Sequence, residues 1–324
     1  MTEYIVARSD VFSSLQEIRR LVSTAEKGRQ SQPSTDETFL HMTLRIGEEM
    51  HKATNTFRVL QSSDRPAAQD MGMTPGGFSA TILNQHPKTR VRAITLPHAD
   101  DGHVVQLQHA NLKLDLKDIN TLAGDLGLDS IPESHPEAKS FSTEKILLDS
   151  EAFDVTICGG QVTRNQKREE WRDNQESRRL ELAQLIIAME HLKLNGTLIL
   201  VLHKPEQFRI VQMLRDFSRF SDIKLFKSTS GHAKRSSFYL IAQRVRPNDP
   251  AALNAVDSWK KEWKVITLGN DVEHERLSRR NVEDVACMME NFGEKLIALG
   301  NPVWKRQLTA LLEAPFIKGS TRRA

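Results

Sequence analysis

The chain has 324 residues, of which 39% are hydrophobic and 27% charged, a balance typical of a soluble globular protein. The formal net charge of +3 permits binding to nucleic acid without requiring it. No apolar run approaches the roughly 20 residues that span a bilayer, and the first residues lack a secretory signal pattern. Two cysteines, Cys158 and Cys287, exclude a disulfide framework and a cysteine-rich zinc site. We therefore expect an intracellular protein, cytoplasmic or nuclear.

Two helices are predicted near the start of the chain. Apolar residues at helical spacing place one over residues 11–26 and a second over about 39–60. The polar segment between them, residues 27–38, contains glycine and proline and should form a loop. Residues 1–50 are accordingly predicted to be a helical N-terminal lead-in.

The most distinctive stretch is Asp70-Met71-Gly72-Met73-Thr74-Pro75-Gly76-Gly77-Phe78-Ser79. It follows a strand candidate, residues 67–70, and leads into apolar residues at helical spacing. A strand, a glycine turn and a helix bring a ligand against the backbone amides of a helix N-terminus. The glycines permit positive φ and close approach, and the proline stiffens the turn. The spacing matches neither the dinucleotide nor the P-loop motif, and an ordinary Pro-Gly turn is the alternative.

Strand and helix patterns alternate after this turn. Strands are predicted at 90–96, 104–107, 112–115, 153–158, 197–202, 223–226 and 237–242, and helices at 178–194 and 207–220. This alternation predicts an α/β fold with a doubly wound sheet over residues 51–246.

A proline-rich boundary at residues 247–250 precedes a helical C-terminal extension, residues 247–324. Its helices are predicted at 253–263, 282–299 and 303–312. We interpret three tryptophans in this region as packing anchors rather than base-stacking platforms: Trp259, Trp263 and Trp304.

The pattern Asp-x-Gly-x-x-Pro-Gly-Gly-Phe-Ser resembles the S-adenosylmethionine motif of the FtsJ-like RNA 2′-O-methyltransferases. The resemblance covers roughly residues 52–245 and implies a Rossmann-like methyltransferase sheet whose last strand is antiparallel. It also implies S-adenosylmethionine as cofactor and RNA ribose as substrate. On this resemblance the residues that bind the cofactor are Asp70, Gly72, Pro75, Gly76, Gly77 and Phe78, with Thr95 at a ribose-binding position and Asp115 near the adenine.

The family's catalytic constellation is Lys-Asp-Lys-Glu. In it, a lysine held by carboxylates orients or deprotonates the ribose 2′-hydroxyl, which is otherwise a poor nucleophile. The resemblance implies Lys52 as the first lysine. The other three positions depart from the family pattern, because they are occupied by Cys158 or Gly159, by Val201 and by Ser237.

Lys204, three residues after Val201, is a candidate replacement base at the carboxyl end of a strand. The alternative is that Lys204 is a solvated surface lysine.

Two groups of basic residues are predicted near the same edge of the sheet, where they could neutralise an RNA backbone: Arg164, Lys167, Arg168 and Arg172, and then His232, Lys234 and Arg235. Acidic residues interleave the first group, so a solvated helix face is its alternative interpretation. No histidine spacing indicates a metal site.

Three functions stay open at this point. The first is an S-adenosylmethionine-dependent methyltransferase acting on RNA ribose. The second is a degenerate member that binds cofactor or RNA without turnover. The third is a methyltransferase whose substrate is a small molecule, with proximity supplying most of the rate.

Overall fold

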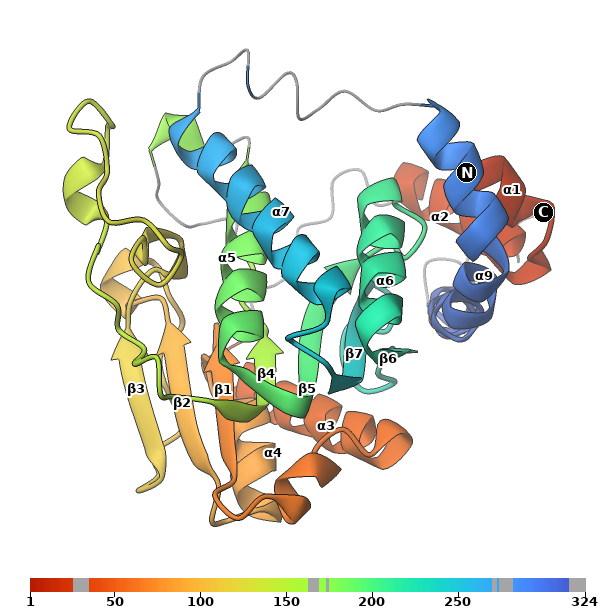
Figure 1. Ribbon diagram of the computed structural model, residues 1–324. Coiled ribbons are helices and arrows are strands. Elements are labelled where there is room, and N and C mark those ends of the chain that lie inside the picture. The colour runs from red at the N-terminus through yellow and green to blue at the C-terminus, as the bar shows by residue number, and fades with distance from the viewer. Residues whose placement is uncertain (26–34, 163–168, 173–174, 270–272, 274–281, 315–324) are drawn as a thin grey trace.

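A seven-stranded mixed sheet forms the centre of the protein, seen in a computed structural model that describes residues 1–25, 35–162, 169–172, 175–269, 273 and 282–314. The strand order is β3-β2-β1-β4-β5-β7-β6 (Figure 1). The strands are β1 (Ala67–Met71), β2 (Arg90–Thr95), β3 (Leu112–Leu116), β4 (Phe153–Cys158), β5 (Leu192–His203), β6 (Asp222–Phe226) and β7 (Ser237–Val245). β7 runs antiparallel to both of its neighbours, β5 and β6, and the other strand pairs are parallel. This confirms the predicted doubly wound sheet with an antiparallel last strand.

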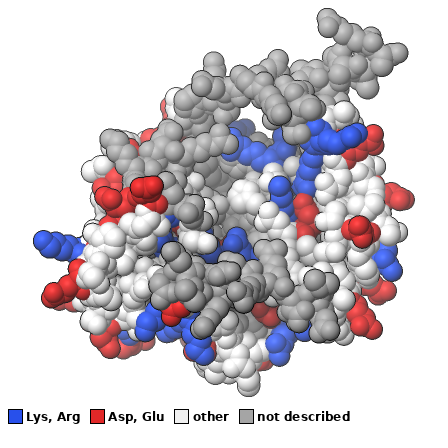
Figure 2. Space-filling view, turned by 90° about the horizontal axis from the view of Figure 1, so that it is seen from above, with Lys and Arg blue, Asp and Glu red and all other residues white. Residues whose placement is uncertain are grey.

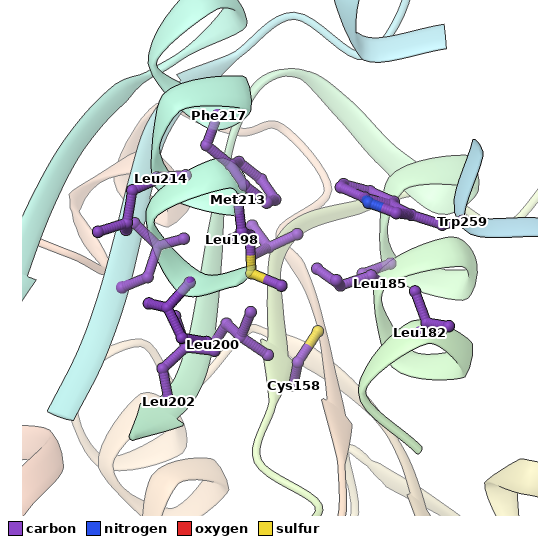
Figure 3. Packing of buried hydrophobic residues seen from close by; sticks show 14 of the residues in the cluster. Cys158, Leu182, Leu185, Leu198, Leu200, Leu202, Met213, Leu214, Phe217 and Trp259 are labelled. Carbon is purple, nitrogen blue, oxygen red and sulfur yellow. The ribbon is translucent and has the colours of Figure 1, made fainter. Parts of the chain in front are cut away.

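Helices cover both faces of the sheet, which is why its central strands are buried and rich in apolar residues. On one face lie α3 (Asp36–Thr54) and α4 (Gly77–Gln85), and on the other α5 (Glu176–His191), α6 (Phe208–Phe220) and α7 (Pro250–Leu268). Figure 3 shows the larger core, in which side chains of β5 such as Leu200 lie beneath Met213 and Phe217 of α6. Trp259 of α7 closes this core beside α5, as expected for a packing anchor.

The two ends of the chain pack on one another beside α6. They form α1 (Thr2–Val6), α2 (Asp10–Ala25) and α9 (Val282–Leu312). The Glu206 carboxylate, just after β5, accepts hydrogen bonds from Arg19 of α2 at 2.6 Å and from the indole N–H of Trp304 of α9 at 3.2 Å. This node fixes the terminal helices against the carboxyl edge of the sheet. The predicted helical extensions are therefore present, but α2 packs on α9, whereas α3 packs on α4.

Several predicted boundaries were wrong. Residues 104–107 form no strand. The helix predicted to reach residue 194 ends at His191, and β5 begins at once. The turn-forming Asn195 is instead an irregularity within β5, with a left-handed φ of 63° and a register shift nearby. Residues 282–312 form one helix that contains Pro302, not two helices.

The division into residues 1–50, 51–246 and 247–324 stays a prediction. None of the described helices is long and apolar enough to cross a membrane.

Candidate cofactor and acceptor site

Asp70 organises the glycine turn from inside the protein. Its carboxylate is 1% exposed and accepts hydrogen bonds from the Ser79 hydroxyl, at 2.6 Å, and from the Ser79 backbone N–H. Burial raises the pKa of Asp70 to about 6, although the two hydrogen bonds from Ser79 lower it. Asp70 thus ties the end of β1 to the first turn of α4, and its oxygens face the protein.

Gly72 brings the turn after β1 into backbone contact with the turn after β4. Its φ is +73°, and a Cβ at this position would overlap the backbone of Gly160. Gly72 also donates its N–H to the carbonyl of Ile94 at 2.7 Å. Gly72, Gly159 and Gly160 remain partly exposed at the carboxyl edge of the sheet. Two adjacent glycine turns therefore present bare backbone to whatever binds at this edge.

The later residues of the motif lie behind this edge. Pro75, Gly76, Gly77 and Phe78 are all buried. A Cβ on Gly76, whose φ is +120°, would lie 2.7 Å from the Cβ of Leu107.

Gly77 has a different neighbour. A Cβ on Gly77 would overlap the Thr43 hydroxyl and lie 2.5 Å from the backbone nitrogen of Leu44 in α3. Gly77 therefore allows α4 to begin in close contact with α3, so its packing role accounts for this glycine without a ligand.

A strap formed by residues 103–107 crosses the glycine turn. His103 Nδ1 lies 2.7 Å from Asp36 Oδ1 at the start of α3, and the Val104 N–H donates to the same carboxylate. The Gln106 N–H donates to the carbonyl of Pro75 at 3.1 Å. These bonds hold the stretch that was predicted as a strand against α3 and the glycine turn, outside the sheet.

Thr95 is placed beside the motif but is already bonded to it. Its hydroxyl lies 2.8 Å from that of Thr74, and the side chain is buried. The structure brings Thr95 to the predicted neighbourhood, where it holds the glycine turn rather than pointing into solvent.

Asp115 lies within β3 opposite Ile94, and its carboxylate forms an ion pair with Arg92 at 2.7 Å. Asp118, which our sequence interpretation missed, follows the end of β3 and so lies nearer the carboxyl edge. Asp118 accepts from Arg172 at 2.7 Å. The signal that could have found Asp118 is its position just beyond a strand end.

The ion pair between Arg172 and Asp118 also shows the role of one member of the first predicted basic group. Arg172 is buried and pairs with Asp118 and Glu176, so it serves packing. Arg164, Lys167 and Arg168 lie outside the described residues.

The structure does not bring Lys52 or Lys204 to the glycine turn. Lys52 is exposed on the last turn of α3, next to His51, whose ring lies 6.3 Å from that of His86 just after α4. That is the end of α4 opposite the turn. Lys204 is exposed, with a φ of 51°, and lines a groove beside α2.

The positions that the resemblance assigns to the rest of the tetrad lie on neighbouring strands, toward the carboxyl edge of the sheet. Gly159 donates its N–H to the carbonyl of Met71. Val201 lies opposite Tyr239, and Ser237 lies opposite His203, in the pairing of β5 with β7. Cys158 is fully buried, and burial raises the pKa of its thiol.

The loop between β6 and β7, residues 227–236, encloses this edge on one side. The Lys227 ammonium is buried and donates to the carbonyls of His232, Arg235 and Ser237. Glu49 of α3 accepts from Ser228, Thr229 and Ser230 at 2.8–3.1 Å. Burial raises the pKa of Glu49, but the hydrogen bonds from this loop lower it overall.

Glu49→Gln should loosen this loop, because an amide accepts fewer hydrogen bonds than a carboxylate. We expect trypsin to cleave after Lys234 or Arg235 several-fold faster in the variant. Since the folded pKa is depressed, Glu49 stabilises the loop above its unfolded pKa of about 4.5 and loses this effect as pH falls below it. Glu48→Gln, an exposed neighbour, is the control, and equal cleavage rates in the two variants would contradict the assignment.

Comparison with known proteins identifies this arrangement. Residues 45–245, more than half of the chain, match the model of the FtsJ-like methyltransferase family. The chain belongs to that family. The sheet order of this FtsJ-like protein, with its antiparallel β7, is that of the Rossmann fold of class I methyltransferases.

Among curated protein sequences, none matches the chain. Solved structures with a similar fold include human methyltransferase-like protein 13 in complex with SAH, at 13% identity and a TM-score of 0.37, covering 69% of this chain and 92% of that one. A rRNA methylase from Streptococcus thermophilus aligns at 13% identity with a TM-score of 0.36, and the alignment covers 67% of this chain and 100% of that one. At this level the likenesses assign no substrate to the FtsJ-like chain. Its described residues contain no group of three or more His, Cys, Asp or Glu side chains that could hold a metal ion.

Proposed function

We propose that this FtsJ-like protein binds S-adenosylmethionine at the carboxyl edge of the sheet, between the turns after β1 and β4, and transfers its methyl group to RNA. The observation that supports this most is the contact of Gly72 with Gly160. It leaves two partly exposed glycine turns side by side in a methyltransferase fold. Ligands in such sheets bind at this edge.

The residues present fit a cofactor that lies against backbone. Gly72 and Gly160 would border the cofactor, because both are partly exposed at the carboxyl edge and carry no side chain that would stand in its way. Asp70 would act indirectly, by holding α4 through Ser79. Bound S-adenosylmethionine supplies an electrophilic methyl group on a sulfonium. The protein has to position an acceptor in line with it and receive the acceptor's proton.

Basic residues beside this edge support an RNA acceptor. Lys204 and Arg20 of α2 line a groove that also contains Glu17 and the Arg19–Glu206 ion pair, and the loop between β6 and β7 contributes Arg235. Figure 2 views the molecule from this side and shows a central hollow with Lys and Arg side chains gathered along part of its rim. Such groups neutralise phosphates without reading sequence.

A cofactor-binding scaffold without turnover is the second candidate. It is favoured by Gly159, Val201 and Ser237, because neither glycine nor valine can transfer a proton and serine is a weak base. A small-molecule acceptor is the third.

A transfer assay separates these candidates. The full chain is incubated with S-adenosylmethionine carrying a tritiated methyl group, and with either total RNA or a small-molecule extract. We expect label in the RNA fraction. Label in the small-molecule fraction alone would overturn the RNA assignment, and binding without label in either would favour the scaffold.

A further inference from the structure

We propose that His203 is the general base for the methyl acceptor, in place of the lysine that the family places two residues earlier on the same strand, at Val201. The inference rests on the proposed function and adds a catalytic residue to it.

His203 lies next to the tetrad positions of β5 and β7. Alternate residues of a strand face the same side, so His203 follows Val201 outward on one face of β5. In the pairing of β5 with β7 it lies opposite Ser237, the position that holds a glutamate in the family. A functional group at residue 203 is therefore one step nearer the edge than the missing lysine, and next to the missing glutamate.

His203 is also linked to the glycine turns. Its Nε2 lies 3.2 Å from the side-chain oxygen of Gln161, and Gln161 follows Gly160, whose backbone contacts Gly72. The chain of contacts from the turn after β1 to His203 passes through only these two residues. An acceptor bound against His203 would lie one strand away from the proposed cofactor site.

A cavity of about 220 Å³ lies at the carboxyl end of β5, between α5 and α6, and has His203 among its lining residues. Its lining combines apolar residues of β5 with Glu181 and Gln184 of α5 and Arg209 of α6, together with Gln161 from the turn after β4 and Gln207 just before α6. This mixture suits the hydroxyl-bearing part of an acceptor.

The two nearby lysines are poor alternatives. All three protons of the Lys227 ammonium are donated to backbone carbonyls. Lys204 lies on the groove beside α2.

The surroundings of His203 lower the pKa of its imidazole below the ordinary value, which favours the neutral form. His203 keeps solvent access at the edge of the sheet, but desolvation by the surrounding protein lowers its pKa most, and Lys227, Arg235 and Lys204 lower it further. Glu181 of α5 opposes them, and His232 also faces the ring. A neutral imidazole is the form that accepts a proton.

The proposed step balances without another reactant. The acceptor oxygen attacks the methyl carbon, the carbon–sulfur bond breaks, and its electron pair stays on sulfur to give S-adenosylhomocysteine. The acceptor proton passes to Nδ1 of His203, because Nε2 already carries the hydrogen that it donates to the Gln161 oxygen, and the ring later releases a proton to solvent.

His203→Gln tests the assignment, with His109→Gln, an exposed histidine outside the strap, as the matched control. Binding of S-adenosylmethionine is measured by calorimetry, and tritium transfer to total RNA is measured from pH 5 to 9. We expect His203→Gln to bind the cofactor within about twofold of wild type but to transfer methyl at least about 100-fold more slowly. Wild type should lose rate as pH falls and His203 becomes protonated, and added imidazole should partly restore transfer in His203→Ala.

The possible outcomes distinguish the role of His203 as general base from the proposed methyltransferase function. Transfer by His203→Gln within about threefold of wild type would overturn the inference and leave the proposed function standing. If wild type binds the cofactor but transfers no methyl group, there is no base to assign and the scaffold is favoured. If folded wild type does not bind, the proposed function fails and the inference fails with it.

Discussion

Replacing Gly72 by alanine should lower the free energy of unfolding by about 3 kcal/mol or more. The new methyl would overlap the backbone of Gly160, and backbone cannot move aside as a flexible side chain can. The positive φ of +73° adds about 1–2 kcal/mol for any residue with a Cβ, and overpacking adds about 1–3 kcal/mol. Urea unfolding followed by circular dichroism measures the change.

Gly159→Ala is the matched control on the facing turn. The nearest atom to its new Cβ would be the carbonyl oxygen of Met71 at 3.4 Å, an ordinary contact, and Gly159 has no positive φ. We expect a change within about 1 kcal/mol, as for a substitution that meets no clash. A similar loss of stability in both variants would show that the contact between the two turns is not what constrains Gly72.

Asp70→Asn should remove a large pH dependence of stability. The pKa of Asp70 is about 6 in the folded protein, against 3.8 without burial, so the folded state binds this proton more tightly than the unfolded state. Stability must then fall as pH rises from about 4 to 6, by about 3 kcal/mol for this group. Asparagine still accepts from Ser79 but does not ionise, so the variant should lack that decline.

The measurement is the difference in unfolding free energy between variant and wild type at several pH values from 4 to 7. Ser79→Ala is a control in which the effect on the pH dependence should be opposite. It removes a hydrogen bond that lowers the pKa of Asp70, so the loss of stability with rising pH should become steeper. A constant difference between Asp70→Asn and wild type across this range would contradict a buried, titrating Asp70.

Local pattern predicted most of the sheet, because its central strands are buried on both faces. The apolar run over residues 153–158 coincides with β4, whose six residues are all buried. The predicted ends of strands and helices were wrong where contacts between distant parts of the chain determine them. Asn195 and Gly196 have the chemistry of a turn, yet pairing with β7 keeps this stretch in β5.

The glycine motif could be recognised from the sequence, but the structural role of each of its residues could not be predicted. Gly76 and Gly77 have the conformational freedom of a ligand loop, and their neighbours are Leu107 and Thr43, which lie far from them in sequence. Spacing along the chain could not reveal such contacts.

The candidate lysines illustrate the same limit. Distance in sequence from Asp70 selected Lys52, but α3 runs past α4 and leaves Lys52 at the opposite end from the turn. His203 escaped attention because it matches no family position. Its relation to Ser237 depends on the pairing of two strands that are distant in sequence.

Calorimetry of the full chain with S-adenosylmethionine tests the central claim most directly. We predict that wild type binds one molecule of cofactor, and that Gly159→Ala, which keeps its fold, binds at least about tenfold more weakly because its methyl would stand at the edge between the two turns. Absence of binding by folded wild-type protein at millimolar cofactor would contradict a cofactor site at the edge bordered by Gly72 and Gly160.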